Sequence, residues 1–291
     1  MKKITQELIS ELYDLLSPCR LCPNDCRAER IKGETGSCRA GSDPKVSSYH
    51  QHFGEEPQLI GTSGSGTIFF AHCNMHCVFC QNYDVSQSGI GKQIGVRRLC
   101  EMMLELQELG SHNINLVTPT PWVPQIVDAL MLAQAGGLTI PVVYNCGGYE
   151  STRTLKLLDG VIDIYMPDIK YSDNALAFKY SGVKDYWDTA RPALVEMHRQ
   201  VGDMVTGQGG IVQKGLLIRH LVLPGDLAGT AACLEFIGMK ISRKAAVNIM
   251  AQYHPAFRAN EFPELSRRIT PGEYQRALKI ADEFGLADTL I

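Results

Sequence analysis

The chain has 291 residues, of which 45% are hydrophobic and 20% are charged. This composition is typical of a globular protein with a large core and excludes fibrous and disordered classes. The formal net charge of -3 offers no strongly basic surface, so we expect neither a nucleic-acid nor a membrane partner.

The first 18 residues, MKKITQELISELYDLLSP, predict an amphipathic helix over residues 4–16, because apolar side chains recur there at helical spacing. Acidic residues at Glu7, Glu11 and Asp14 interrupt the segment, so it has no signal-peptide character. No apolar run reaches the length that crosses a bilayer. We therefore expect a cytoplasmic location.

Four cysteines follow this helix in residues 19–40, a segment with too few apolar residues to form a core of its own. They are Cys19, Cys22, Cys26 and Cys38. Clustered thiols without an export signal usually bind metal rather than form disulfides. The four thiolates suit either a closed zinc site or a complete [4Fe–4S] cluster. Residues 1–60 are thus predicted to be an N-terminal metal-binding extension.

Short β-rich runs alternate with helical patterns through residues 61–291, which predicts βαβ units and a parallel sheet. The β-runs are 67–70, 114–117, 141–144, 161–165, 216–223 and 247–250, and the helical patterns include 96–109, 123–135 and 227–239. Six repeats favour an α/β fold of the partial (β/α)6 TIM-type barrel class, with its chemistry at the carboxyl ends of the strands.

Two further segments of this region have recognisable local patterns. The glycine-rich stretch 202–215 is predicted to be a flexible loop. Thr270, Pro271 and Glu273 form the pattern of a capping box, which predicts a last helix that covers the outside of the barrel.

A second group of thiols, Cys73, Cys77 and Cys80, directly follows the first β-run. Three thiolates at this spacing can hold three irons of a cubane cluster, and the next cysteine, Cys100, lies in a helical pattern too far along to join them. The fourth iron then has no protein ligand and can chelate an amino and a carboxylate group. The alternatives are a structural zinc site or a plain electron-transfer cluster.

The pattern CxxxCxxC, with the aromatic residue Phe79 before its last cysteine, resembles the signature of the radical S-adenosylmethionine (SAM) superfamily. The surrounding GTIFFAHCNMHCVFCQNYDVSQ is similar to the branch of pyruvate formate-lyase activating enzymes. The resemblance extends over nearly the whole chain, through CRLCPNDC, NINLVTPTPWVPQI, PVVYNCGGYE, IYMPDIKY and IRHLVLPG.

This resemblance implies an oxidoreductase that binds a [4Fe–4S] cluster, cleaves SAM reductively and abstracts hydrogen from a protein or peptide substrate. Activation of a glycyl radical enzyme is one such reaction, and a flavodoxin or ferredoxin-type protein is the implied electron donor. Two alternatives stay open: a radical SAM enzyme that acts on a small molecule, and a non-catalytic iron–sulfur electron carrier.

The resemblance also implies which residues contact SAM. Asp168 and Lys170 are spaced by two in an extended segment, so their side chains point to one side, and the family's Asp-x-Lys contacts SAM at this place. Arg219 is a charged residue within an apolar β-run, and His254 follows the last run. Both match cofactor contacts of the family, although a solvent-facing Arg and a structural His are the simpler interpretations.

Four weaker candidates complete the set. Phe79 and Gln81 lie at the end of the cysteine motif. Many relatives carry Gly-Gly-Glu after the second strand to receive the methionine amine, whereas this chain has Val117-Thr118-Pro119-Thr120, so Thr118 is the candidate replacement. Asn145, at the end of the third β-run, is a candidate contact for the ribose.

Overall fold

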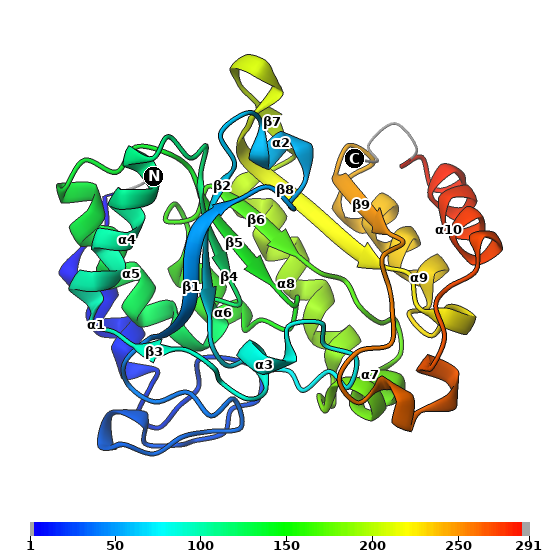
Figure 1. Ribbon diagram of the computed structural model, residues 1–291, viewed down its shortest axis with the longest axis horizontal. Coiled ribbons are helices and arrows are strands. Elements are labelled where there is room, and N and C mark those ends of the chain that lie inside the picture. The colour runs from blue at the N-terminus through cyan, green and yellow to red at the C-terminus, as the bar shows by residue number, and fades with distance from the viewer. Residues whose placement is uncertain (1–2, 287–291) are drawn as a thin grey trace.

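The computed structural model describes residues 3–286, and a nine-stranded sheet forms its centre (Figure 1). The strands are hydrogen-bonded in the order β3-β1-β2-β4-β5-β6-β8-β7, and β9 also pairs with β8. The parallel strands are β2 (Ser65–Phe70), β4 (Ile114–Val117), β5 (Val142–Cys146), β6 (Ile164–Pro167), β8 (Val212–Leu221) and β9 (Ala246–Met250). This is a partial barrel of six parallel strands, as the sequence predicts.

The helices of the described residues join these strands and flank the sheet (Figure 1). They are α1 (Gln6–Asp14), α2 (Pro57–Ile60), α3 (Tyr83–Ser86), α4 (Val96–Glu108), α5 (Val123–Ala135), α6 (Thr152–Leu157), α7 (Asn174–Ser181), α8 (Tyr186–Val201), α9 (Thr230–Phe236) and α10 (Pro271–Glu283). None of these helices is long and apolar enough to cross a bilayer.

The amphipathic helices form as their apolar spacing predicts. In α4, Leu99, Met103 and Leu106 recur every three or four residues, and all three side chains are fully buried in the main core. The predicted capping box at the start of α10 is confirmed: the Thr270 hydroxyl accepts from the Glu273 amide, and the Glu273 carboxylate accepts from the Thr270 amide. Helix α10 lies at the outer edge of the molecule beside α9 (Figure 1).

Three short or polar strands run antiparallel to their neighbours and were not predicted. They are β1 (Lys45–His52), β3 (Lys92–Gln93) and β7 (Val205–Thr206). Strand β1 pairs with β2 along six residue pairs, so the sheet already begins within residues 1–60.

Several predicted boundaries are wrong by a few residues. The run 161–165 is a strand only from Ile164, because Val161 and Ile162 still belong to the turn around Gly160, whose φ is 82°. The stretch 202–215 is not wholly a loop, since β7 and the first residues of β8 lie within it. In the pattern 227–239, α9 starts only at Thr230 and ends in a π-helical turn, Ile237–Ile241.

The cysteine-rich N-terminal segment packs its few apolar residues into the core of the barrel. Leu21 and Ala40 are buried there together with Cys19 and Cys38. The Arg30 guanidinium is also buried; it donates to the carbonyl oxygens of Gly41 and Pro121 and lies over the Trp122 ring. The segment is therefore attached to the barrel by packing and by hydrogen bonds.

Candidate functional site

The loop with Cys73, Cys77 and Cys80 connects β2 to α3, at the carboxyl end of the parallel strands (Figure 1). It begins at His72, which has a φ of 72°, a conformation that residues other than glycine rarely adopt. Strain of this kind persists only where the surrounding structure holds it, and it is frequent at functional sites.

Backbone hydrogen bonds fix this loop against two distant parts of the chain. The amides of His76 and Val78 donate to the carbonyl oxygens of Ser181 and Tyr180, both at 2.8 Å. On the other side, the Arg258 amide donates to the Val78 carbonyl oxygen, also at 2.8 Å. The end of α7 and the segment after β9 thus hold the loop from opposite sides.

Each of the three thiols has at least one polar neighbour. The Met75 amide donates to Cys73 Sγ at 3.4 Å, and the Ser181 hydroxyl donates to Cys77 Sγ at 3.0 Å. Cys80 Sγ lies 3.1 Å from the Ser86 hydroxyl. Hydrogen bonds to ligand sulfurs are a main means by which proteins adjust the potential of an iron–sulfur cluster.

The thiols also lie close enough to one another to interact electrostatically. Burial raises the pKa of the Cys73 thiol well above its usual range, and the neighbouring Cys77 and Cys80 raise it further. Burial raises the pKa of Cys77 to about 11, although the nearby Lys170 ammonium opposes this shift. Three clustered thiols beside a cation, one buried and two partly buried, are a donor set that fits an iron–sulfur cluster, whose positive irons favour thiolates.

Asp168 and Lys170 lie across a pocket from this loop, and the structure brings Arg219 to them. Asp168 forms a buried ion pair with the Lys170 ammonium, and Arg219 Nε donates to its second oxygen at 3.0 Å. Their side chains are 13%, 18% and 16% exposed, so all three charges are largely withdrawn from water. The simpler interpretation of Arg219 as a solvent-facing side chain is therefore wrong.

The pKa shifts of this triad follow from competition between burial and pairing. Burial alone would raise the pKa of Asp168, but the Lys170 and Arg219 cations outweigh it and hold that pKa below its usual range. Burial alone would lower the pKa of Lys170, but the Asp168 carboxylate raises it. All three groups are consequently ionised at neutral pH.

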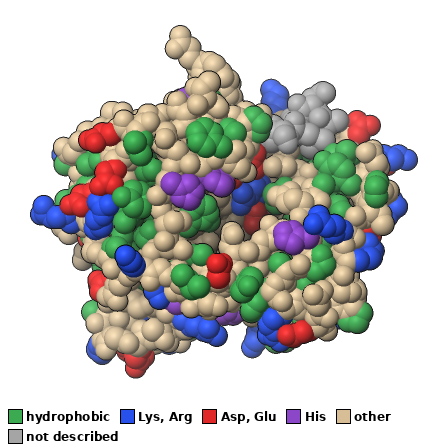
Figure 2. Space-filling model, viewed as in Figure 1, with side chains coloured by type: hydrophobic (Ala, Val, Ile, Leu, Met, Phe, Trp, Pro, Cys, Tyr) green, Lys and Arg blue, Asp and Glu red, His purple; other side chains and the backbone are tan. Residues whose placement is uncertain are grey.

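The triad and the cysteine loop line one cavity of about 240 Å³. Its lining residues are Cys77, Phe79, Cys80, Gln81, Asn82, Asp168, Lys170, Arg219, Leu221, Met250 and Gln252. Figure 2 shows that this face of the molecule is hollowed near its centre, with acidic and basic side chains inside the hollow. We refer to the cavity as the cofactor pocket.

The remaining predicted residues lie around the cofactor pocket at different distances. Gln81 and His254 contact each other, with Gln81 Nε2 3.2 Å from His254 Nδ1. The Phe79 ring packs edge-on against Tyr253 at a centroid distance of 5.9 Å. His254 itself does not line the cofactor pocket, and its contact with the pocket runs through Gln81.

Thr118 and Asn145 occupy neighbouring strand ends outside the pocket lining. Thr118 directly follows β4, has a φ of 60°, and donates its amide to the Asn145 carbonyl oxygen at 2.9 Å. The Asn145 side-chain oxygen accepts from Arg219 Nη2 at 2.6 Å. Asn145 therefore orients Arg219 and reaches the pocket through it.

Sequence reasoning missed two acidic residues in the barrel interior. Glu55 Oε2 lies 3.4 Å from Arg219 Nη1, and Glu55 Oε1 accepts from Asn115 Nδ2 at 3.1 Å. Glu56 Oε1 accepts from Asn248 Nδ2 at 2.8 Å. Both carboxylates come from the loop between β1 and α2, in which no periodic pattern or motif marked them.

The four N-terminal cysteines gather in one place beside the barrel. Burial is the largest influence on the pKa of Cys38 and raises it. The thiols of Cys19 and Cys26 raise this pKa further, whereas the buried Arg30 guanidinium lowers it. Within residues 3–286 no group of three or more His, Cys, Asp or Glu side chains is arranged to hold a metal ion. This finding covers both cysteine groups and does not decide between zinc and an iron–sulfur cluster.

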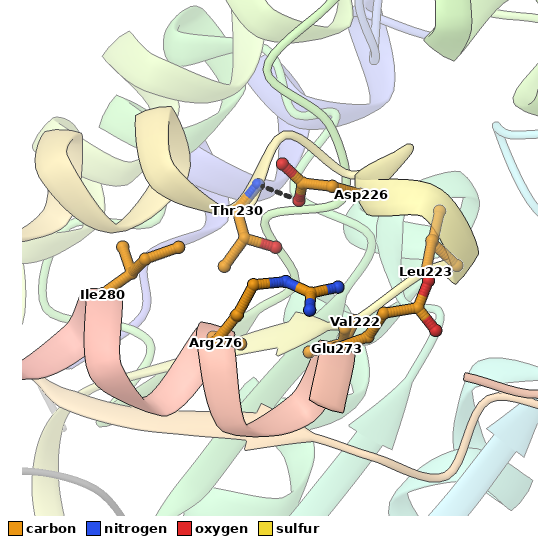
Figure 3. A pocket seen from close by; sticks show the side chains of 8 residues that line it. Val222, Leu223, Asp226, Thr230, Glu273, Arg276 and Ile280 are labelled. Carbon is orange, nitrogen blue, oxygen red and sulfur yellow. Dashed lines mark hydrogen bonds between the residues drawn. The ribbon is translucent and has the colours of Figure 1, made fainter. Parts of the chain in front are cut away.

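A smaller cavity of about 120 Å³ lies between α10 and the segment that joins β8 to α9 (Figure 3). Its acidic groups cap helices: Asp226 accepts from the Thr230 amide at 2.9 Å, and Glu273 belongs to the capping box of α10. These contacts account for its two acidic residues, and we assign it no site.

One protein is similar to this chain along most of its sequence, and several solved structures are similar to it in fold. No protein-family model matches it. Protein MJ0674 of Methanocaldococcus jannaschii is 33% identical over 282 residues, which cover 94% of this chain and 77% of that protein. The crystal structure of HydG, a maturase of the [FeFe]-hydrogenase, matches with a TM-score of 0.51 at 14% identity, over 75% of this chain and 48% of HydG.

A domain of pyruvate-formate lyase-activating enzyme from Bacteroides vulgatus also matches, with a TM-score of 0.40 at 10% identity. This match covers 57% of the present chain and 88% of that domain.

Proposed function

The chain belongs to the family of protein MJ0674 and has the partial-barrel fold of radical SAM enzymes, and from this premise we propose that it is itself a radical SAM enzyme. The observation that carries the proposal is the cofactor pocket, in which two of the three loop cysteines meet the buried Asp168–Lys170–Arg219 triad. Fold alone does not define an activity, so the residues of this pocket carry the argument.

In the proposed enzyme, Cys73, Cys77 and Cys80 hold three irons of a [4Fe–4S] cluster. The cluster and SAM, when bound, supply the reductive cleavage of a C–S bond and a 5′-deoxyadenosyl radical that abstracts hydrogen from the substrate. The protein positions both groups and shields them from water. Phe79 packs between the cluster loop and Tyr253, and the buried aromatic residues around it exclude solvent from that side.

The charged triad suits the polar parts of SAM. Lys170 and Arg219 carry donors that pair with a carboxylate or with ribose hydroxyls, and Asp168 accepts from an amine or a hydroxyl. Because Asp168, Lys170 and Arg219 already hold one another in place, little side-chain entropy is lost when the cofactor binds. Gln81 lines the pocket beside the cysteine loop, and His254 contacts Gln81 from outside the lining.

For the substrate we propose a protein or peptide, as the likeness to activating enzymes suggests, with a glycyl radical enzyme as one candidate. An electron donor of the flavodoxin or ferredoxin type would supply the reducing electron. We also propose that Cys19, Cys22, Cys26 and Cys38 form a second closed site, for zinc or for another iron–sulfur cluster. The alternatives remain a small-molecule substrate and a non-catalytic electron carrier.

Anaerobic reconstitution with iron and sulfide, followed by dithionite and SAM, tests the central proposal. The wild-type chain should form 5′-deoxyadenosine and methionine, and the Cys77→Ala variant should not. Cys100→Ala, which changes a buried cysteine of α4 outside the pocket, is the matched control and should retain activity. Absence of 5′-deoxyadenosine from a wild-type protein with an intact cluster would support the electron-carrier alternative.

The proposal that the protein activates a glycyl radical enzyme is tested separately. The reconstituted protein is mixed with glycyl radical enzymes encoded in the same genome and examined by EPR after SAM is added. A glycyl doublet identifies the partner. If no glycyl radical enzyme gives a doublet, the activation proposal is wrong, but the proposal that the protein is a radical SAM enzyme is unaffected.

A further inference from the structure

A second cavity, of about 430 Å³, adjoins the cofactor pocket inside the barrel. It is lined by Gly54, Glu55, Glu56, Pro57, Arg219, Asn248, Met250 and Gln252. Arg219, Met250 and Gln252 line both cavities, so the two share a wall. A group bound in this second cavity would lie directly beside a molecule bound in the cofactor pocket.

The cavity contains a buried acceptor that is not satisfied. Glu56 is 5% exposed, and its Oε1 accepts from Asn248, but its Oε2 has no hydrogen-bond partner among the described residues. The neighbouring carboxylate, Glu55, accepts from Asn115, whose own fully buried Oδ1 also lacks a partner within residues 3–286. Buried acceptors without donors are rare in folded proteins and call for an explanation, such as a ligand that supplies the donor.

Acidic side chains outnumber basic ones in the lining of the two cavities. The acidic residues are Glu55, Glu56 and Asp168, and the basic residues are Lys170 and Arg219. Arg219 already donates to Asp168 and Asn145, and its contact with Glu55 is long, at 3.4 Å. Burial raises the pKa of Glu55, which Arg219 offsets only in part. A cationic group bound near Glu55 would oppose this shift and stabilise the ionised carboxylate.

The position of the acidic pair argues against a role in holding the amine of SAM. Glu55 and Glu56 directly precede α2, which lies at the opposite end of the barrel from α3 and the cysteine loop (Figure 1). In the proposed enzyme the amine of SAM would be held at the cysteine end, where Cys73, Cys77 and Cys80 would hold the cluster. A cationic group of the substrate can then pair with the unsatisfied oxygen of Glu56.

We propose that Glu55 and Glu56 bind a protonated amine or a guanidinium group of the substrate, with Glu56 as the principal ligand. This inference rests on the proposed function for what lies in the adjoining pocket, and it names the substrate class. A cavity of about 430 Å³ accommodates a lysine or arginine side chain of a peptide, or a small polyamine. Recognition of the cation at one end of the cavity would place a neighbouring C–H bond near the cofactor.

Binding of charge-matched probes to the reconstituted full-length protein with SAM tests the proposal. The probes are N-acetyl-Gly-Lys-Gly-amide, its norleucine counterpart, which lacks the ammonium group, and agmatine, a small molecule with an amine and a guanidinium. Isothermal titration or saturation-transfer NMR measures each dissociation constant. The wild-type protein should bind the lysine peptide or agmatine about tenfold or more tightly than the norleucine peptide, because hydrogen bonds to charged groups are the strong ones.

The variant Glu56→Gln keeps the shape of the side chain but removes its charge, and it should lose this preference. Glu55→Gln should weaken it, and Glu108→Gln, an exposed change at the end of α4, should leave it unaltered. Preference for agmatine alone identifies a small amine as the substrate class, and preference for the peptide identifies a basic protein side chain.

Two results would overturn the proposal. The first is equal binding of all three probes by the wild-type protein. The second is a Glu56→Gln variant that is folded but binds SAM tenfold more weakly, because the carboxylate would then serve the cofactor. Binding is measured without turnover, so a protein that prefers the lysine peptide yet forms no 5′-deoxyadenosine contradicts the proposed function and not this inference.

Discussion

The side-chain amide of Asn24 donates to the carbonyl oxygen of Asn74 at 2.8 Å. Asn24 lies between Cys22 and Cys26, and Asn74 lies between Cys73 and Cys77, so this one hydrogen bond joins the two cysteine segments. The Asn74 side chain in turn donates to the Tyr149 carbonyl oxygen at 2.7 Å. The N-terminal segment is therefore attached directly to the loop that we assign to the cluster.

Replacing Asn24 by alanine should loosen this attachment. The variant loses one side-chain hydrogen bond, which is worth about 1 kcal/mol of unfolding free energy. Chemical denaturation of the wild type and the variant measures the difference, and limited proteolysis should cut the variant faster within residues 19–40. The control is Asn260→Ala, an exposed change in the segment after β9. Equal loss of stability in both variants would show that the contact between the two segments contributes nothing.

The metal of the N-terminal cysteines can be separated from that of the cluster loop by substitution. A variant with both Cys19→Ala and Cys22→Ala should lose the metal of the first site and retain the iron bound at Cys73, Cys77 and Cys80. Metal analysis of this variant and of the wild type decides the identity: a loss of zinc indicates a structural site, and a loss of about four irons indicates a second cluster. Unchanged metal content in the double variant would exclude a metal site at these cysteines.

The buried triad gives a prediction for Asp168. The change Asp168→Asn leaves the Lys170 and Arg219 cations without their shared carboxylate, and breaking a buried ion pair from one side costs about 3 kcal/mol or more. We expect this loss in the free energy of unfolding, together with a decrease of about tenfold or more in SAM affinity, measured by denaturation and by equilibrium dialysis.

The matched control is Asp188→Asn, which breaks an exposed ion pair with Arg191 and should change stability by less than about 1 kcal/mol. If Asp168→Asn were as mild as this control, the triad would not be the electrostatic centre of the pocket.

A strand could be predicted from the sequence where its residues form an apolar run. Parallel strands such as β4 and β5 are buried on both faces, so their apolar runs are visible in the sequence. Strand β1 was missed because most of its residues are polar and half-buried or exposed, including His50 and Gln51, and no apolar run marks it. Helices such as α4 and α10 could be predicted because apolar spacing and capping are local signals.

Some residues of the candidate site could be predicted from the sequence, and others could not. The cysteine spacing and the pair Asp168 and Lys170 are local patterns, so the sequence could indicate them. Glu55 and Glu56 lie in an aperiodic loop, and their burial arises only when that loop folds into the barrel beside Arg219. The ribose contact of Asn145 stays a prediction. The structure adds its hydrogen bond to Arg219, a partner 74 residues away that no local pattern reveals.

A buried glutamate outside the pocket gives the protein a pH dependence of stability. Glu150 is 2% exposed, and burial raises its pKa to about 7, although hydrogen bonds from Thr120 and Tyr144 oppose the shift. In the unfolded chain its pKa returns to about 4.5. Between these values the folded state retains a proton that the unfolded state has lost, so stability decreases as the pH rises, by roughly 3 kcal/mol in total.

The variant Glu150→Gln should remove this dependence, because an amide has no proton to lose in this range. Denaturation at pH 5 and pH 8 should show a smaller difference for the variant than for the wild type, with the variant more stable at pH 8. Glu261→Gln, at an exposed glutamate paired with Arg258, serves as the control. A wild-type protein that is more stable at pH 8 than at pH 5 would contradict the assignment.

The proposed function depends most on one cluster iron that no protein side chain ligates and to which SAM binds. Electron–nuclear double resonance on the reduced, reconstituted protein with SAM labelled with ¹⁵N at its amine measures this directly. We predict a resolved nitrogen coupling to the cluster in the wild-type protein, which shows that the amine binds an iron. A reduced cluster that shows no such coupling with SAM present at saturation would contradict the assignment of Cys73, Cys77 and Cys80 to a catalytic cluster.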